Sequence, residues 1–300
     1  MPRSLLVYNP AAGQWWRRPR PEVLLLALAR RGWTAELLVT RGQDHATELV
    51  REHLTGDVEA VWACGGDGTV AQAAAALVGS EVPLGILPHG TVNVLALECG
   101  VPRDPLRAVE ALAGLPGARR FQAWKSGARA VMLGAGVGFE ARAIGNVSTP
   151  AKSWLGFLAV GAQGVAEWAR YEFPQLRVSG VDHHGNHFDL SATQVLATNP
   201  RRYAGHFPVA PDADPEDALL DVVLFRGDSR VRMAEFWLGV ELPGALHLRV
   251  PGAAVLRARH LRVESADGRA VEAHLNGDAV ETTPLSVGPW GRVRLLATGR

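Results

Sequence analysis

Short apolar runs alternate with amphipathic segments from Ser4 to Leu87, and this alternation limits the fold more than any other feature of the sequence. The apolar runs predict strands at 4–8, 34–40, 58–64 and 83–87, and the segments between them predict helices at 21–31, 44–54 and 70–78. Strands joined by helices of about ten residues favour a parallel sheet with helices on its faces. In such sheets, ligands bind beyond the carboxyl ends of the strands.

The pattern changes near residue 120, where Gly, Pro, Asn and Asp begin to separate short apolar runs. The runs lie at 128–133, 176–178, 194–198, 219–225, 261–263 and 292–296. They predict an antiparallel β domain, interrupted by one helix at about 151–169. We therefore expect an α/β domain over 1–122 and a β domain over 123–287, with the last strand, about 288–300, returning to the first domain.

Composition excludes several classes of protein. The 31 Lys and Arg residues balance 30 Asp and Glu to a net charge of +1, which gives no field suited to nucleic acid. Two cysteines, Cys64 and Cys99, are too few for a disulfide scaffold and indicate a reducing cytoplasm. No apolar stretch approaches the roughly 18 residues of a membrane span, so we expect a soluble protein. Peripheral membrane contact stays open, because Trp15, Trp16, Arg17 and Arg18 combine interfacial aromatic rings with cations, although loop packing with solvated arginine is the favoured interpretation.

The segment GGDGT at 65–69 lies between a predicted strand and a predicted helix. Without Cβ atoms at Gly65, Gly66 and Gly68, the backbone can approach an anion and point its N–H groups at it. Phosphates repel the carboxylate of Asp67 unless a cation bridges them or the carboxylate accepts a proton. The segment therefore predicts a phosphate site with Mg²⁺, base chemistry or both. The alternative is a tight strand-to-helix turn in which Thr69 caps the helix.

Polar residues follow the other predicted strands as well. Asn9 follows the first strand, Thr40 ends the second, and Thr91 and Asn93 follow the fourth. Parallel strands bring these loops to one edge of the sheet, so all four could donate hydrogen bonds to the same phosphates. Lys125 and Lys152 are the only lysines, and neither lies in a P-loop motif. A phosphate site here must rely on backbone amides, arginine and metal.

These segments resemble the diacylglycerol kinase catalytic family, in particular the soluble bacterial lipid kinases related to diacylglycerol and sphingosine kinases. The resemblance rests on GGDGT (65–69), PLGILPHGTVN (83–93), GVGFEA (136–141), YAG (203–205), DALLD (217–221) and NGD (276–278). GGDGT is shared with NAD kinases, so an NAD kinase-like activity is a further alternative. The run at 83–93 is similar to the lipid kinase branch.

The resemblance implies a Rossmann-like parallel α/β nucleotide domain and an antiparallel β-sandwich that holds the lipid. It implies transfer of the γ-phosphoryl group of ATP to a lipid hydroxyl at the membrane surface, in a cleft between the two domains. Asp278 corresponds to the family's proton acceptor, and Asp67 helps to place metal or substrate. Together with the strand ends, the expected nucleotide contacts are Asn9, Thr40, Gly65, Gly66, Asp67, Gly68, Thr69, Val70, Ala71, Gln72, Thr91 and Asn93. The expected Mg²⁺ ligands are Asp217 and the carbonyls of Asp214 and Leu219, since oxygen ligands suit this cation.

The sequence departs from the family pattern at several acidic positions. Val94, Gln72 and Gln122 stand where the family has carboxylates, and Asp-Gly-Glu has become Asn276-Gly277-Asp278. A homologue that binds nucleotide or lipid without transferring phosphate is therefore the alternative function. The sequence determines neither which lipid is phosphorylated nor whether the chain forms a homodimer.

Overall fold

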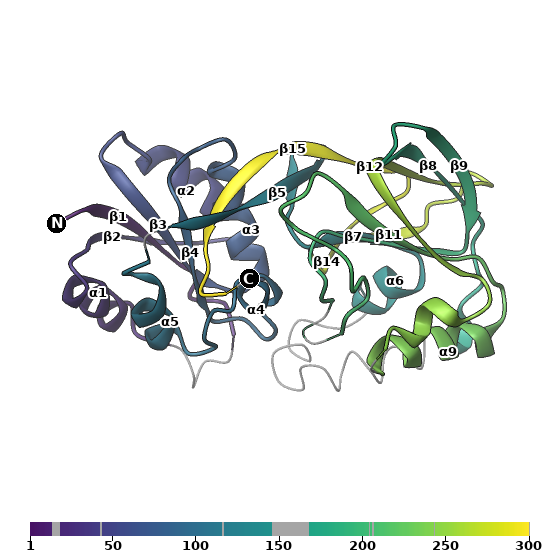
Figure 1. Ribbon diagram of the computed structural model, residues 1–300, viewed down its shortest axis with the longest axis horizontal. Helices are drawn as coiled ribbons and strands as arrows, with labels where there is room; N and C mark the ends of the chain where they lie inside the picture. Colours follow the sequence, from purple (N-terminus) through teal and green to yellow (C-terminus); the bar gives the residue numbers. More distant parts are fainter. Residues whose placement is uncertain are drawn as a thin grey trace. The chain divides into compact units, whose positions relative to one another are not determined.

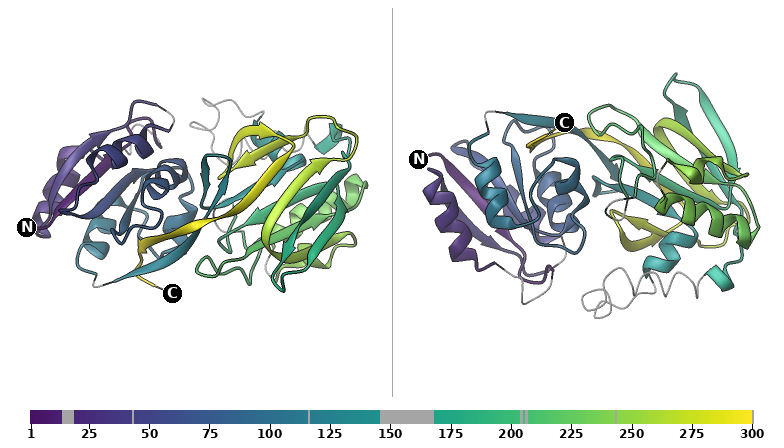
Figure 2. Two further views of the ribbon diagram at one scale, coloured as in Figure 1. Left: turned by 90° about the horizontal axis from the view of Figure 1, so that it is seen from above. Right: turned by 60° about the horizontal axis from the view of Figure 1, so that its bottom comes forward.

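The computed structural model describes residues 1–13, 19–42, 44–115, 117–145, 168–203, 205, 207–242 and 244–299 (Figures 1 and 2). The chain forms two compact units, Met1–Ala123 with Trp290–Arg300, and Trp124–Pro289. Strands β5 (Ala118–Ser126) and β15 (Leu285–Leu296) each contain residues of both units. The Trp15 to Arg18 segment and most of the helix expected at 151–169 lie outside the described residues.

The first unit contains a parallel sheet in the order β4-β3-β1-β2, which confirms the predicted α/β fold. Its strands are β1 (Arg3–Tyr8), β2 (Thr34–Val39), β3 (Val58–Gly65) and β4 (Leu84–Pro88). Its helices are α1 (Pro21–Arg30), α2 (His45–His53), α3 (Asp67–Ala76), α4 (Val94–Glu98) and α5 (Pro105–Leu112). Helices α1 and α5 lie on one face of the sheet, and α2 and α3 lie on the other (Figure 1).

Local signals account for the helix starts in this unit. Pro21 occupies the first turn of α1, where its missing N–H costs nothing, and Leu24 and Leu28 are buried one turn apart. In α5, Asp104 accepts hydrogen bonds from the amides of Leu106 and Arg107 at 3.0 Å and 2.9 Å. This is the side-chain cap that such a helix start prefers.

A tryptophan fills the space left by a glycine in the middle of this sheet. Trp62 on β3 is fully buried, and its register partner on β4 is Gly85. A Cβ atom built on Gly85 would lie 2.3 Å from the Trp62 ring. The glycine of the PLGILP segment is therefore required by packing in this chain.

The second unit is built from antiparallel strands, as predicted. The path β14-β13-β7-β10-β11-β12-β15 is joined by β8 and β9, which extend from β12. The strands are β6 (Arg129–Val131), β7 (Gly134–Val137), β8 (Leu176–Asp182), β9 (His187–Ala192), β10 (Gln194–Thr198), β11 (Leu220–Phe225), β12 (Ala253–Ser265), β13 (Glu272–Leu275) and β14 (Asp278–Thr282).

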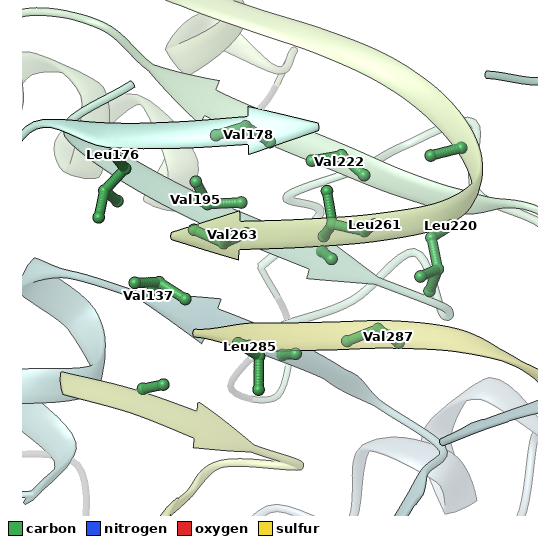
Figure 3. Close-up of a cluster of buried hydrophobic side chains, with 14 of the residues drawn as sticks. Val137, Leu176, Val178, Val195, Leu220, Val222, Leu261, Val263, Leu285 and Val287 are labelled. Atoms are coloured by element: carbon green, nitrogen blue, oxygen red, sulfur yellow. The ribbon is translucent and has the colours of Figure 1, made fainter. Parts of the chain in front are cut away.

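Strand β12 changes partners along its length, and this makes the unit a sandwich. Its first half pairs with β11 and its second half with β8 and β15, with a register shift between Ala258 and His260. A Cβ on Gly180 of β8 would lie 2.0 Å from the carbonyl oxygen of His260, so only glycine fits opposite this bulge. Buried apolar side chains between the strands form a core cluster that includes Val178, Val222 and Val263 (Figure 3).

The expectation of a single helix in the second unit was wrong. Helices α6 (Phe139–Gly145) and α9 (Arg230–Glu241) and a 3-10 turn, Leu246–Arg249, are present. Met233, Phe236 and Val240 of α9 are buried in a second apolar cluster, which is rich in aromatic rings. The exposed face of α9 also carries apolar residues such as Leu238, so the sequence lacks a clear helical contrast between its faces.

We predict that Gly85→Ala destabilises the first unit by about 1–3 kcal/mol, because the added methyl overpacks the Trp62 ring. Thermal denaturation should show a lower Tm. Gly56→Ala is the matched control, since a Cβ there meets no atom within 4 Å. Equal Tm values for the two variants would contradict the packing argument.

Candidate functional site

The loops after all four parallel strands start at one edge of the first sheet. The amide of Asn9 donates to the carbonyl of Cys64 at 2.9 Å, that of Thr40 to Tyr8 at 3.0 Å, and that of His89 to Gly65 at 2.8 Å. Each bond continues the sheet by one residue beyond a strand end. We call residues 9–13, 65–69 and 88–93 the strand-end edge, and Thr40 lies beside them at the end of β2.

Glycines allow the loops of the strand-end edge to touch. A Cβ on Gly90 would lie 2.5 Å from the Cα of Gly66, and a Cβ on Gly13 would lie 2.1 Å from the carbonyl oxygen of His89. Asn9 adds a side-chain link, because its Nδ2 donates to Oγ1 of Thr69 at 2.8 Å. The structure therefore brings together the glycine-rich and asparagine-containing segments that the sequence predicted to meet.

Asn93 closes the loop after β4 on itself. Its Oδ1 accepts from the amide of Gly90 at 3.0 Å, its Nδ2 donates to the carbonyl of Gly90 at 2.9 Å, and its φ is 58°. Thr91, at the tip of this loop, is exposed. Asn93 thus shapes the loop, and Thr91 is the side chain open to a ligand.

Asp67 holds the start of α4. Its Oδ2 accepts from the amide of Val94 at 3.0 Å, and its Oδ1 accepts from the amide of Leu95 at 3.2 Å. Helix α4 receives no cap from its own N-cap residue, Asn93, so a carboxylate from another segment supplies the acceptors. Sequence reasoning missed this role, and it explains a carboxylate beside a phosphate-type loop without invoking a cation.

The first turn of α3 is the part of the strand-end edge best suited to an anion. Its N-cap is Gly66, which has no side chain to accept from the first-turn amides, and Gly66, Asp67 and Gly68 are partly exposed. Helix N-termini and exposed backbone N–H groups bind phosphate oxygens. The side chains of Val70 and Ala71 are buried and face the core, so neither is open to a ligand.

Two other polar groups near α3 are engaged in packing. Gln72 accepts from the amide of Ala46 at 3.3 Å through Oε1, and its carbonyl accepts from Thr47 Oγ1 at 2.8 Å. Both bonds connect α3 to α2. Cys64, just before Gly65, is buried, and burial raises the pKa of its thiol to about 12, so it is no nucleophile.

Asp278 belongs to the second unit, at the start of β14. Asn276 and Gly277 form the two-residue loop between β13 and β14, with φ values of 53° and 84°. Positive φ at both positions is the type I′ hairpin that Asn-Gly favours. The loop leaves Asp278 exposed.

Asn276 fixes this hairpin to the segment before β7. Its Oδ1 accepts from the amides of Met132 and Leu133 at 2.8 Å and 3.0 Å, and its Nδ2 donates to the carbonyl of Ala130 at 2.7 Å. A carboxylate lacks the N–H donor needed for the third bond. The amide that replaces the family's carboxylate here has a structural function.

The loop expected to bind Mg²⁺ is held by protein groups. Asp217 Oδ2 is hydrogen-bonded to the guanidinium of Arg257, and Asp217 Oδ1 accepts from the amide of Leu219 at 2.9 Å. The carbonyl of Asp214 accepts from the amide of Asp217 at 3.1 Å. Both oxygens of Asp217 are bonded to protein groups in this arrangement, and Mg²⁺ at Asp214, Asp217 and Leu219 stays a prediction.

Arg257 was not among the residues singled out from the sequence, because it lies on β12, far from this loop in the chain. Its Nε is 3.8 Å from Oδ1 of Asp221, which is buried. Burial raises the pKa of the Asp221 carboxyl to about 6, with Arg257 opposing the rise and Asp217 and Asp212 adding to it. Arg257 is thus the cation that this acidic loop contacts.

In the described part of the chain, no group of three or more His, Cys, Asp and Glu residues is arranged to hold a metal ion. None of the helices in that part is long and apolar enough to cross a membrane.

Family models match both units of the chain. Residues 3–119 match the diacylglycerol kinase catalytic domain, and residues 132–295 match the YegS C-terminal NAD kinase beta sandwich-like domain. A Pseudomonas fluorescens protein named "probable lipid kinase YegS-like" is 30% identical over 275 residues, which cover 88% of this chain and 86% of that protein. The Bacillus subtilis diacylglycerol kinase is 25% identical, covering 79% and 77%.

A solved structure shares the fold. The crystal structure of a diacylglycerol kinase from Bacillus anthracis superposes with a TM-score of 0.73 at 19% identity, covering 99% of this chain and 97% of that one. At this identity the likeness concerns the fold alone.

We predict that Asp67→Ala lowers the stability of the ligand-free first unit by about 0.5–2 kcal/mol, the cost of losing a helix cap. Asp104→Ala, which removes the cap of α5, is the matched control and should lower Tm by a similar amount. An Asp67→Ala variant as stable as the wild type by thermal denaturation would contradict the capping role.

We also predict that Arg257→Gln destabilises the second unit by roughly 1–3 kcal/mol, because Asp221 then stays buried without a nearby cation. Arg262→Gln, which breaks a surface pair with Glu264, should cost at most about 1 kcal/mol.

Thermal denaturation of the wild type in EDTA and in Mg²⁺ tests the predicted metal site at Asp214, Asp217 and Leu219. A wild-type Tm that rises with Mg²⁺ would show that the loop releases Arg257 for a metal.

Proposed function

Because the chain belongs to the diacylglycerol kinase catalytic family of lipid kinases, we propose that it transfers the γ-phosphoryl group of ATP to the hydroxyl of a diacylglycerol-like lipid. The single observation that carries the proposal is the strand-end edge, where backbone amides and small residues converge. A kinase with few lysines needs such an edge to hold phosphates.

In this proposal, the first turn of α3 and the loops around it bind the ATP phosphates. Gly66, Gly68 and Thr91 are accessible and supply N–H or hydroxyl donors. Asn9 and Asn93 keep the neighbouring loops in place, and Thr40 borders the same edge. ATP enters as its Mg²⁺ complex, which neutralises part of the phosphate charge that a lysine-poor edge leaves unbalanced.

Asp278 is the proposed base. The lipid hydroxyl oxygen attacks the γ-phosphorus, the bond between that phosphorus and the bridging oxygen of ADP breaks, and the hydroxyl proton passes to the Asp278 carboxylate. The exposure of Asp278 and its place directly after a two-residue loop that Asn276 anchors support this role. Since Asp278 and the strand-end edge belong to different units, the proposal requires both units to act on the same substrates.

The lipid is proposed from the names of relatives and from the chemistry of the reaction. Two relatives are named diacylglycerol kinase, and a diacylglycerol presents one free hydroxyl at the membrane surface. We propose that the chain works from the cytoplasm and reaches this hydroxyl peripherally.

A homologue that binds nucleotide or lipid without transferring phosphate is the second candidate function. It is favoured by the bonds that occupy the side chains at the altered positions. Gln72 joins α3 to α2, and Asn276 anchors the β13–β14 hairpin, so neither amide is directed at a ligand.

We predict that the wild type transfers radiolabelled phosphate from γ-labelled ATP to diacylglycerol in mixed micelles, and that Asp278→Asn lowers kcat by at least about a hundredfold, because the amide takes up no proton. Asp189→Asn, which alters an exposed carboxylate paired with Arg177 on the same unit, should keep wild-type activity.

If the wild type and Asp278→Asn formed equal amounts of labelled lipid, Asp278 would not be the base. No labelled product across diacylglycerol, sphingoid bases, phosphatidylglycerol and polyprenols, together with ATP binding by calorimetry, would favour the binding homologue instead.

A further inference from the structure

A buried acid–base pair lies behind the hairpin that carries Asp278. Nε2 of His274 on β13 is 2.8 Å from Oε2 of Glu140 on α6. The two side chains are 1% and 8% exposed, so water does not screen the pair. Figure 1 labels α6, β7 and β14 in this unit.

The GVGFEA segment makes the space for this pair. Gly136 is the register partner of His274 between β7 and β13. A Cβ on Gly136 would lie 2.2 Å from His274 Nε2 and 2.5 Å from Glu140 Oε2. In this segment, Gly136 leaves space for the His274 ring and Glu140 contacts its Nε2. The ring centroids of Tyr203 and His274 are 6.4 Å apart.

The other ring nitrogen holds the hairpin loop. The amide of Gly277 donates to Nδ1 of His274 at 3.3 Å. A backbone N–H can only donate, so Nδ1 carries no proton. The ring proton is therefore on Nε2 and points at Glu140, and this pair of contacts selects one tautomer of the imidazole.

Stability alone gives no reason to keep this pair. Oε1 of Glu140 is buried and has no hydrogen-bond partner among the described residues. A buried carboxylate with an unsatisfied oxygen is costly, and apolar side chains of similar volume stabilise such sites at least as well. The pair therefore calls for an explanation outside packing.

We propose that His274 is a positioning residue for the phosphoryl transfer: its Nδ1 fixes the Gly277 amide and so places the adjacent Asp278, and Glu140 orients the ring. This inference rests on the proposed function, in which Asp278 is the base. A shift of about 1 Å in a reacting group costs on the order of a hundredfold in rate, so one hydrogen bond beside the base has a large effect.

Two substitutions separate the two nitrogens of the ring. In His274→Asn, Oδ1 takes the place of Nδ1 and still accepts from Gly277, whereas the contact with Glu140 is lost. In His274→Gln, Nε2 still donates to Glu140, whereas the acceptor for Gly277 is lost. His247→Gln, which alters a buried histidine bonded to the carbonyl of Val209, is the matched control.

In lipid phosphorylation assays below the Tm of every variant, His274→Gln should lower kcat about tenfold to a hundredfold, and KM for ATP should stay within about twofold. His274→Asn should lose clearly less kcat than His274→Gln. His247→Gln should lower Tm and keep kcat. Equal kcat losses in the two His274 variants, or losses that follow Tm alone, would overturn the proposal.

The hydrogen bond from the Gly277 amide to Nδ1 of His274 can also be tested without an activity assay. In the full chain with ¹⁵N-labelled histidine, the signal that disappears in His274→Asn should show a proton on Nε2 and none on Nδ1. The Gly277 amide should be protected from hydrogen exchange in the wild type and in His274→Asn, and unprotected in His274→Gln. A protonated Nδ1 would overturn the positioning role at its hydrogen bond, whereas this tautomer without lipid phosphorylation by the wild type would show that the hydrogen bond is present and that the proposed function fails.

Discussion

Direct backbone contact between the loops after β3 and β4 is the constraint on which the strand-end edge depends. Gly66 and Gly90 approach so closely that a Cβ on Gly90 would lie 2.5 Å from the Gly66 Cα. The same approach brings Asp67 to the first amides of α4, and so ties the helix after β4 to the helix after β3. Glycine thus acts here through packing, because only a residue without a Cβ allows this approach.

The acidic positions that changed in this chain have different explanations. At Asn276, the side-chain N–H donates to the carbonyl of Ala130, a bond that aspartate cannot make. At Gln72, the bond used is one that an oxygen of glutamate also accepts, so packing does not require the amide. At Val94, the backbone amide donates to Asp67 whatever the side chain is. The change at Asn276 adds a hydrogen bond and the change at Val94 places an apolar side chain in a buried position, whereas the change at Gln72 alters charge near the strand-end edge without a structural gain.

The sequence predicted what local patterns encode. Strands β1 to β4 and the helices between them follow from apolar periodicity, and the meeting of Asn9 with Thr69 follows from parallel strands. Helix α4 could not be found this way, because it has only five residues, starts after a positive φ, and is capped by a carboxylate 27 positions earlier. Arg257 with Asp217 and His274 with Glu140 are separated by 40 and 134 positions. No local pattern connects residues so far apart, and the motif that contains Glu140 gave no sign of its partner.

Asp67 and Asp278 therefore differ in what their surroundings allow. Both oxygens of Asp67 accept backbone N–H groups of α4, so its carboxylate is engaged in holding that helix. Asp278 is exposed and follows a hairpin loop fixed by Asn276 and His274. A general base must be accessible to the proton that it accepts. Both oxygens of Asp67 already hold α4, and the exposed Asp278 is the carboxylate that we propose as the base. Asn276 and His274 hold the loop that precedes Asp278, and placing that carboxylate is the role that we propose for the buried pair of His274 and Glu140.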